Sequence, residues 1–157
     1  IGIARKIAEK PRLDGQLDEP FWQSAQLLEL KSPLGDDPQW PAVALVAYDD
    51  DFLYLAARCQ RPAPQDPPPP SAARPRDPDL SSQDRVEWLI DVDRDYATYY
   101  RLVIDHRGWV AEDCWGDTTW NPSWYVARGG DESRWSVEAA IPYSSSSSQP
   151  MPPTLWR

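Results

Sequence analysis

Residues 83–91 read QDRVEWLID and place three carboxylates, Asp84, Glu87 and Asp91, within one short segment. Two carboxylates that flank a cleft can serve as general acid and base, as they do in glycoside hydrolases. In a β-strand, however, successive side chains point to opposite sides of the sheet. Asp84 and Glu87 are an odd number of residues apart, so they face opposite sides and form no local acid–base pair.

The strands predicted at 85–91 and 98–105 sort their side chains by this alternation. One side is apolar and forms a core face: Val86, Trp88, Ile90, Tyr100, Leu102 and Ile104. The other side points outward: Arg85, Glu87, Leu89, Tyr99, Arg101 and Val103.

If these strands form a hairpin, their core faces match only when paired residue numbers have an even sum, because a one-residue slip inverts every side chain. A sum of 188 places Trp88 opposite Tyr100, and Glu87 directly opposite Arg101 on the outer face. This pair is either an ordinary cross-strand ion pair of small energetic value or a carboxylate and a forked donor suited to sugar hydroxyls. The two residues alone leave both interpretations open.

Three tryptophans, Trp115, Trp120 and Trp124, lie in the segment CWGDTTWNPSW at 114–124. Exposed indoles would suit stacking on sugar rings, whose C–H faces pack on aromatic faces. Alternatively, Trp120 and Trp124 are inward anchors around a turn at 121–122. Of the three, we expect Trp115 to be the exposed one.

Other reactive residue types give no complete site. The segment DVDRD at 91–95 begins like a calcium loop, but Tyr96 and Leu102 stand where glycine and glutamate are needed. His106 is expected in a turn, and no nucleophile with its base is apparent. Cys59 and Cys114 are expected as small buried hydrophobes, with a single disulfide as the alternative.

Composition narrows the class of protein. The net charge of −9 argues against nucleic-acid binding, which needs a basic patch. No apolar run approaches the length of a membrane span, and no signal peptide precedes Ile1. Nine tryptophans and seven tyrosines supply area for a core and for flat ligand platforms. A chain of 157 residues suits one domain, over 1–157.

Most segments alternate with the period of strands, at 42–48, 52–59, 85–91, 98–105, 109–115, 124–128 and 134–141. The first two flank DDD and predict a hairpin. Helical spacing is limited to 18–28, and we expect one or two turns there. The proline-rich segment 60–79 and the serine- and proline-rich segment 144–153 are expected as loops. The predicted fold class is all-β, an antiparallel β-sandwich with at most one short N-terminal helix.

Several motifs together resemble family 9 carbohydrate-binding modules. They are LDGQLDEPFW at 13–22, VALVAYDDDFLYLAARC at 43–59, QDRVEWLIDVD, YRLVID followed by Gly108, WNPSW, and RWSVEAAIPYSS at 134–145. Their order and spacing cover residues 11 to 145. The resemblance implies a jelly-roll-like β-sandwich that binds poly- or oligosaccharides, is attached to or partners a secreted glycoside hydrolase, and holds structural calcium. It also implies an extracellular or periplasmic location.

Glu87 and Arg101 match a glutamate and an arginine of that family's sugar site. The family also sandwiches the sugar ring between two tryptophans, and here the chain departs from the pattern. One tryptophan position falls at Ser81–Ser82, and the other falls in C-terminal strands that this sequence, ending at Arg157, lacks. Trp115, Trp120 and Trp124 are therefore the candidates for the stacking platform.

The predicted function is a non-catalytic carbohydrate-binding module whose ligand-binding residues are Glu87, Arg101, Trp115, Trp120 and Trp124. No catalytic residue or metal ligand is assigned, and no cofactor is implied apart from calcium. Three alternatives remain: a haem or redox domain, for which His106 and Met151 are the available axial ligands, a hydrolase in its own right, and a structural or adhesive domain.

Overall fold

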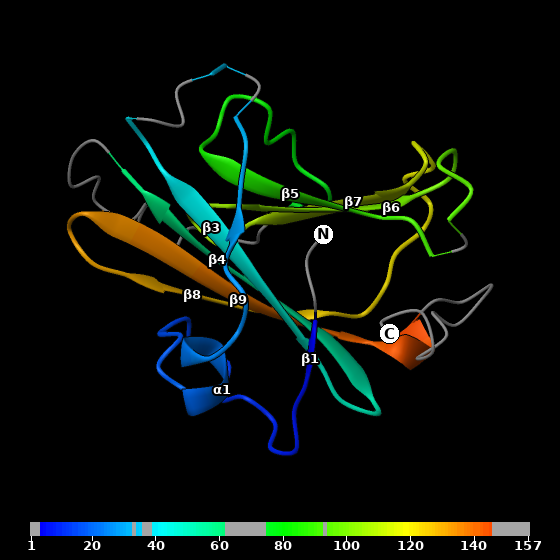
Figure 1. Cartoon of the computed structure of the whole chain (residues 1–157). Helices are drawn as coiled ribbons and strands as arrows, with labels where there is room; N and C mark the ends of the chain where they lie inside the picture. The colour runs from blue at the N-terminus through cyan, green and yellow to red at the C-terminus, as the bar shows by residue number, and fades with distance from the viewer. Residues whose placement is uncertain (1–3, 33, 36–38, 62–74, 93, 146–157) are drawn as a thin grey trace.

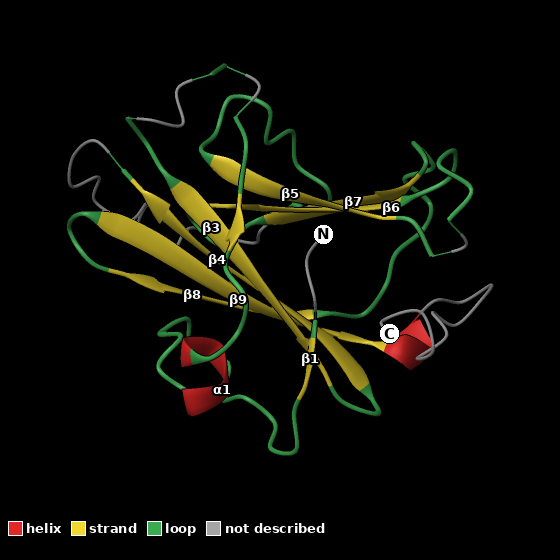
Figure 2. Cartoon of the chain, viewed as in Figure 1, coloured by secondary structure: helices red, strands yellow, loops and turns green. Residues whose placement is uncertain are grey.

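The computed structural model describes residues 4–32, 34–35, 39–61, 75–92 and 94–145, and within them two β-sheets face each other (Figure 1). Within these ranges, helix is limited to α1 (Pro20–Gln23) and a 3-10 turn at Tyr143–Ser145, as Figure 2 shows. The strands are β1 (Arg5–Lys6), β2 (Leu28–Glu29), β3 (Ala42–Tyr48), β4 (Phe52–Gln60), β5 (Arg85–Ile90), β6 (Tyr100–Asp105), β7 (Val110–Cys114), β8 (Tyr125–Gly130) and β9 (Arg134–Pro142). The predicted all-β sandwich is confirmed.

The larger sheet has the strand order β1-β3-β4-β9-β8, with β2 also paired to β3. The predicted β3–β4 hairpin is present, with Tyr48 opposite Leu53. One pairing differs from the predicted antiparallel pattern, because β1 runs parallel to β3. The smaller sheet is the antiparallel set β5-β6-β7.

Period-2 alternation explains how the two sheets pack. The inward side chains of β4, β5, β6 and β9 form one buried core that includes Leu55, Trp88, Leu102 and Trp135. Cys59 belongs to this core, as predicted, and both cysteines are free thiols. Burial in this core raises the pKa of the Cys59 thiol to about 12.

The N-terminal segment covers the opposite face of the larger sheet, where α1 lies below the sheet in Figure 1. The helix has Pro20 in its first turn and buries Trp22, but it is shorter than the 18–28 pattern allowed. After Gln23 the chain leaves the helix and continues to strand β2, where the apolar Leu28 pairs with Ala44 of β3. Most of the predicted loops at 60–79 and 144–153 lie outside the described residues.

A buried carboxylate fastens the N-terminal motif to the last strand. Glu138 of β9 has no exposed surface, and its Oε2 accepts the amide N–H groups of Gly15 at 2.7 Å and Asp14 at 3.1 Å. Its Oε1 accepts the indole N–H of Trp22 at 2.9 Å. The LDGQLDEPFW motif therefore has a structural role, since Asp14, Gly15 and Trp22 all bond the same side chain.

Two glycines make this contact sterically feasible. A Cβ atom on Gly15 would lie 2.3 Å from the backbone carbon of Arg128, and one on Gly129 would lie 2.3 Å from the carbonyl oxygen of Gly15. Gly15 also has a φ of +78°, which disfavours other residues. The loop and β8 thus meet backbone to backbone.

We expect Gly15→Ala to destabilise the protein by about 3 kcal/mol or more, because it adds overpacking to left-handed strain. Gly35→Ala is the matched control. Gly35 has a similar φ of +73° but no atom within 4 Å of its added Cβ, so only the strain of about 1–2 kcal/mol applies. Chemical denaturation of both variants measures the difference, and equal destabilisation would show that the close approach does not matter.

Candidate functional site

The outward side of the smaller sheet carries four charged residues and one leucine that together we call the charged face: Arg85, Glu87, Leu89, Arg101 and Asp113. These side chains come from β5, β6 and β7, and the ladder places Leu89, Arg101 and Asp113 side by side. Strand β5 alternates as predicted, with Val86, Trp88 and Ile90 buried and Glu87 and Leu89 exposed.

The register of the β5–β6 hairpin differs from the prediction by two residues. Glu87 lies opposite Val103 and Arg101 lies opposite Leu89, so the paired numbers sum to 190 and the predicted sum of 188 is wrong. Glu87 and Arg101 are diagonal neighbours, a separation that long side chains can span. Their ion pair still forms, with Arg101 Nε 3.2 Å from Glu87 Oε2.

Val103 corrects a second expectation. It belongs to the outward set, yet it has no exposed surface. Strand β6 is the central strand of the sheet, so Val103 has a cross-strand neighbour on both sides, Glu87 and Ala111. Val103 is therefore a covered apolar centre of the charged face, whereas the apolar Leu89 on the same face is exposed.

Arg101 is held between two carboxylates. Its Nη1 donates to Asp113 Oδ2 at 2.9 Å, while Nε donates to Glu87, which Arg85 Nε also contacts at 2.7 Å. Partial burial by itself would raise the pKa of Glu87, but the hydrogen bonds from Arg85 and Arg101 hold that pKa below its ordinary value. Burial likewise opposes the charge on Arg101, yet its bonds to Asp113 and Glu87 raise its pKa. Glu87 and Arg101 are therefore both ionised near neutral pH.

Asp113 joins this arginine to the turn that follows β7. It is nearly buried, and while Oδ2 accepts from Arg101, Oδ1 accepts the amide N–H of Gly116 at 2.7 Å. The turn carries Trp115 beside Gly116, and the amide of Trp115 donates to the carbonyl of Tyr99, which immediately precedes β6. One carboxylate thus fixes both the guanidinium and the turn that displays the indole.

Trp115 is the exposed tryptophan of its segment, as predicted, with 65% of its surface accessible. Its φ of 51° lies in the left-handed region, which is costly for a large residue with a Cβ. An exposed aromatic side chain in a strained conformation, beside an ion-pair network, makes this surface a candidate functional site. The sequence predicted the exposure of Trp115, but no sequence pattern indicated its left-handed backbone conformation.

Trp120 and Trp124 lie away from the charged face. Trp120 is buried in the core, where its ring packs at a tilt on Tyr100 with centroids 4.8 Å apart, so it offers no exposed platform. Trp124 is half-buried, and its indole N–H donates to Oε2 of the buried Glu112 at 3.3 Å. Both residues follow the inward-anchor alternative that the sequence left open.

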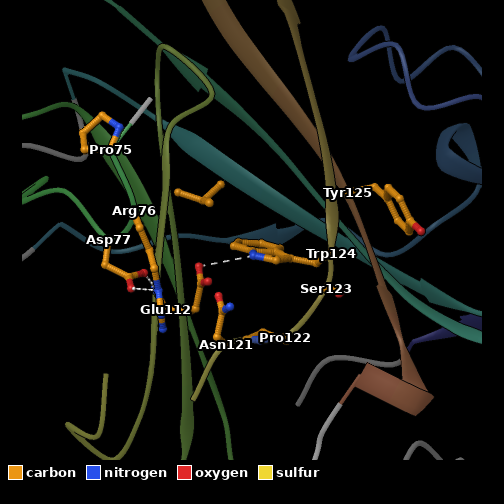
Figure 3. A pocket seen from close by; sticks show the side chains of 10 residues that line it. Pro75, Arg76, Asp77, Glu112, Asn121, Pro122, Ser123, Trp124 and Tyr125 are labelled. Carbon is orange, nitrogen blue, oxygen red and sulfur yellow. Dashed lines mark hydrogen bonds and ion pairs between the residues drawn. The ribbon is translucent and has the colours of Figure 1, made fainter. Parts of the chain in front are cut away.

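Trp124 and Glu112 line a pocket of about 360 Å³ between the edge strands β7 and β8 (Figure 3). The indole points toward Glu112, whereas Tyr125 points to the other side of its strand. Asp77 also lines this pocket, and its Oδ1 accepts the backbone N–H of Glu112 at 3.3 Å. That bond satisfies an edge-strand donor, and no sequence pattern indicated Asp77 or Glu112.

The remaining predicted residues have local roles. Asp84 points inward and accepts the indole N–H of Trp135 at 2.7 Å, so it is separated from Glu87 as predicted. In the loop after β5, Asp91 accepts the amides of Arg94 and Tyr96, and Asp95 those of Ala97 and Thr98. These carboxylates shape the turn.

The described residues offer neither a metal-ligand cluster nor a membrane-spanning helix. These residues contain no group of three or more His, Cys, Asp or Glu side chains that could hold a metal ion. His106 lies in the β6–β7 turn, with its amide bonded to the carbonyl of Asp84, while Met151 lies outside the described residues. In the part of the chain that the structure describes, no helix is long and apolar enough to cross a membrane.

The charged face offers binding chemistry. A guanidinium presents forked donors, the carboxylates present acceptors, and both are fixed by neighbours before any ligand arrives. The exposed indole adds a flat apolar surface. This combination suits a ligand that has many hydroxyl groups and an apolar ring face.

Comparison with known structures places the fold among carbohydrate-binding modules. The structure is similar to a family 9 carbohydrate-binding module from Caldicellulosiruptor kristjanssonii in complex with glucose, with a TM-score of 0.60 and 18% identity, covering 93% of this chain and 70% of that one. A complex of such a module from the same organism with cellotriose gives a TM-score of 0.61 and 20% identity, covering 93% and 69%. A structure from Bacteroides uniformis gives 0.59 and 13% identity, covering 90% and 72%.

The sequence comparisons are negative. No protein-family model matches the chain, and no curated protein matches it significantly. The resemblance predicted from the sequence motifs is therefore confirmed at the level of the fold: the chain has the β-sandwich fold of family 9 carbohydrate-binding modules.

Proposed function

We propose that this protein is a non-catalytic carbohydrate-binding module and that the charged face, together with Trp115, binds the sugar. The observation that carries the proposal is Arg101, fixed between Glu87 and Asp113 beside an exposed tryptophan in a left-handed conformation. The fold supports it, since the structural neighbours were solved with glucose and cellotriose.

In this proposal, each group has one role. Glu87 accepts hydrogen bonds from sugar hydroxyls, and Arg101 donates to hydroxyl oxygens through the N–H groups that its carboxylate partners leave free. Trp115 stacks on the C–H face of a ring. Because Asp113 fixes both Arg101 and the Trp115 turn, binding requires little ordering of the site, which favours affinity.

Isothermal titration calorimetry with cellotriose and glucose tests the proposal. Saturable binding that is weakened by about 1–3 kcal/mol in each of Glu87→Ala and Arg101→Ala supports it. Unchanged affinity in both variants would remove the charged face as the site, and absence of binding to a broad glycan panel would remove the function.

Trp115→Gly should separate function from stability. Glycine adopts a φ of 51° without strain, so the free energy of unfolding should rise by about 1 kcal/mol, while sugar affinity should fall because the indole is lost. Trp115→Ala is the matched control, since it removes the indole but keeps the strain. If both variants bind cellotriose as the wild type does, Trp115 is not the platform.

The setting of the module is part of the same proposal. By the motif resemblance, it is attached to or partners a glycoside hydrolase and acts outside the cytoplasm, in the extracellular space or periplasm. The resemblance also implies structural calcium, although the described residues contain no cluster of three or more ligands that could hold it. Thermal unfolding with and without a calcium chelator tests this point, because a structural ion stabilises the fold by mass action.

A further inference from the structure

A second hollow lies on the larger sheet, on the face away from the smaller sheet. Its volume is about 310 Å³, and its lining includes Pro41 and Val43, Arg58 and Gln60, and Arg134. These residues share one face of adjacent strands, because Val43 lies opposite Arg58 and Gln60 lies opposite Arg134. The N-terminal segment covers Tyr54 and Ala56 on this face, and the hollow lies further along β4, beyond that cover.

Arg58 is the unusual residue here. It is half-buried, and within the described residues no hydrogen bond or ion pair engages its guanidinium. Burying part of a charge without a partner costs free energy. In a protein of net charge −9, potential carboxylate partners are abundant, so an uncompensated arginine in a hollow indicates an anionic ligand.

The other charged groups leave the hollow electropositive. Arg134 uses its Nε on Asp131 at 3.1 Å, which leaves its Nη groups for a ligand. Asp131 is already engaged by the amide and hydroxyl of Ser133, which with Arg134 lower its pKa to about 2. A second carboxylate, Glu29, lies opposite Val43 on the next strand, with Lys31 Nζ 3.6 Å away. The positive groups around the hollow therefore outnumber the carboxylates.

The volume and the lining residues of the hollow favour a small ring that carries a carboxylate. Its volume is near the lower end of the range for small-molecule sites, about 300–1,000 Å³, which fits a single ring. Pro41 and Val43 supply an apolar wall, and the Gln60 amide supplies a neutral donor. A guanidinium matches a carboxylate in a bidentate geometry better than it matches a hydroxyl.

We propose that this hollow is a second ligand site, specific for a carboxylate-bearing sugar ring such as a uronic acid residue. The carboxylate would lie against Arg58 and the Nη groups of Arg134, with the ring against Pro41 and Val43. The site is independent of the charged face, because it lies on the other sheet and shares no residue with it.

A titration of the ¹⁵N-labelled protein with D-glucuronate, followed by amide chemical shifts, tests the site. We expect saturable shifts at Gln60, Ser133 and Arg134, and none with glucose or with the neutral methyl ester of glucuronate at the same concentrations. Equal shifts with sodium sulfate would overturn the assignment to a sugar, and equal shifts with the methyl ester would overturn the role of the carboxylate.

Variants sharpen the result. Arg58→Gln should weaken glucuronate binding by about 10-fold or more, because the bidentate contact is lost, whereas Arg58→Lys keeps the charge and should weaken it less. Arg12→Gln, which removes the same charge from an exposed position, should bind normally. Affinity in Arg58→Gln within two-fold of the wild type would overturn the proposal.

Glu87→Ala distinguishes this site from the proposed function. It should weaken cellotriose binding by about 10-fold or more and leave the glucuronate shifts unchanged. Weakening of both in Glu87→Ala would show that glucuronate binds the charged face, which contradicts a second site.

Discussion

Replacing Arg101 by alanine should weaken the binding of cellotriose by about 1–3 kcal/mol, because it removes the forked donor and leaves Glu87 and Asp113 without their shared partner. Asp113 is 7% exposed, and Arg101 Nη1 lies 2.9 Å from its Oδ2. The substitution therefore removes the ion-pair partner of a nearly buried carboxylate as well as a donor to the ligand. Calorimetry measures the change in affinity.

The controls for Arg101 address folding and charge. Arg12→Ala removes an arginine whose side chain is 88% exposed and should leave binding unchanged. Arg101→Lys keeps the charge but loses the fork, so it should retain only part of the affinity. Full affinity in Arg101→Lys would show that the charge alone matters and that the two-carboxylate clamp does not orient the ligand.

Replacing Glu138 by alanine should lower the free energy of unfolding by about 3 kcal/mol or more, as much as we expect from Gly15→Ala. The substitution leaves three donors unsatisfied: the part-buried amide of Asp14, the buried amide of Gly15 and the buried indole N–H of Trp22. Each costs about 1–3 kcal/mol before relaxation. Glu29→Ala, at an exposed carboxylate, should change stability by no more than about 0.5 kcal/mol. Urea denaturation compares the two, and similar midpoints would contradict the fastening role of Glu138.

The pH dependence of Glu138 has a definite sign. Burial raises the pKa of its carboxyl above the ordinary 4.5, and the hydrogen bonds from Trp22, Gly15 and Asp14 offset only part of that shift. The native state then binds a proton more readily than the unfolded state, so the contribution of this group to stability falls as pH rises from about 4.5 through the raised pKa. The stability difference between the wild type and Glu138→Gln should shrink over the same interval, and a difference that grows would contradict the raised pKa.

Alternation predicted which way most side chains face but could not set the register of the charged face. Faces follow from a fixed period of two, and Val86, Trp88 and Glu87 lie as that period requires. The register of the β5–β6 hairpin depends on how many residues stay unpaired in the loop between the two strands. Asp91 and Asp95 bond loop amides internally, so the ladder resumes at Tyr100, opposite Ile90, two residues later than expected.

The residues that sequence reasoning missed owe their importance to the assembled structure and not to a local sequence pattern. Asp113 is predictable as a strand residue. Its two hydrogen bonds, from Arg101 and from the amide of Gly116, depend on a turn that no sequence pattern indicates. Arg58 reads as one polar position in an apolar strand, and its lack of a partner is visible only once the sheet is assembled. The burial of Trp120 and Trp124 likewise depends on how far the 114–124 segment folds back over the core.

The fastening of the N-terminal motif by Glu138 also constrains when the chain can fold. The bonds from Asp14, Gly15 and Trp22 span 124, 123 and 116 residues, so none can form until β9 has been synthesised. Closing such long loops is slow, and strand pairings of high contact order delay the transition state. During translation, β3 and β4 would form a hairpin that lacks its neighbour β9, and Tyr54 and Ala56 would stay uncovered by the N-terminal segment. A nascent chain arrested before residue 138 should therefore stay protease-sensitive over its first 25 residues, and protection there should appear only with the last strand.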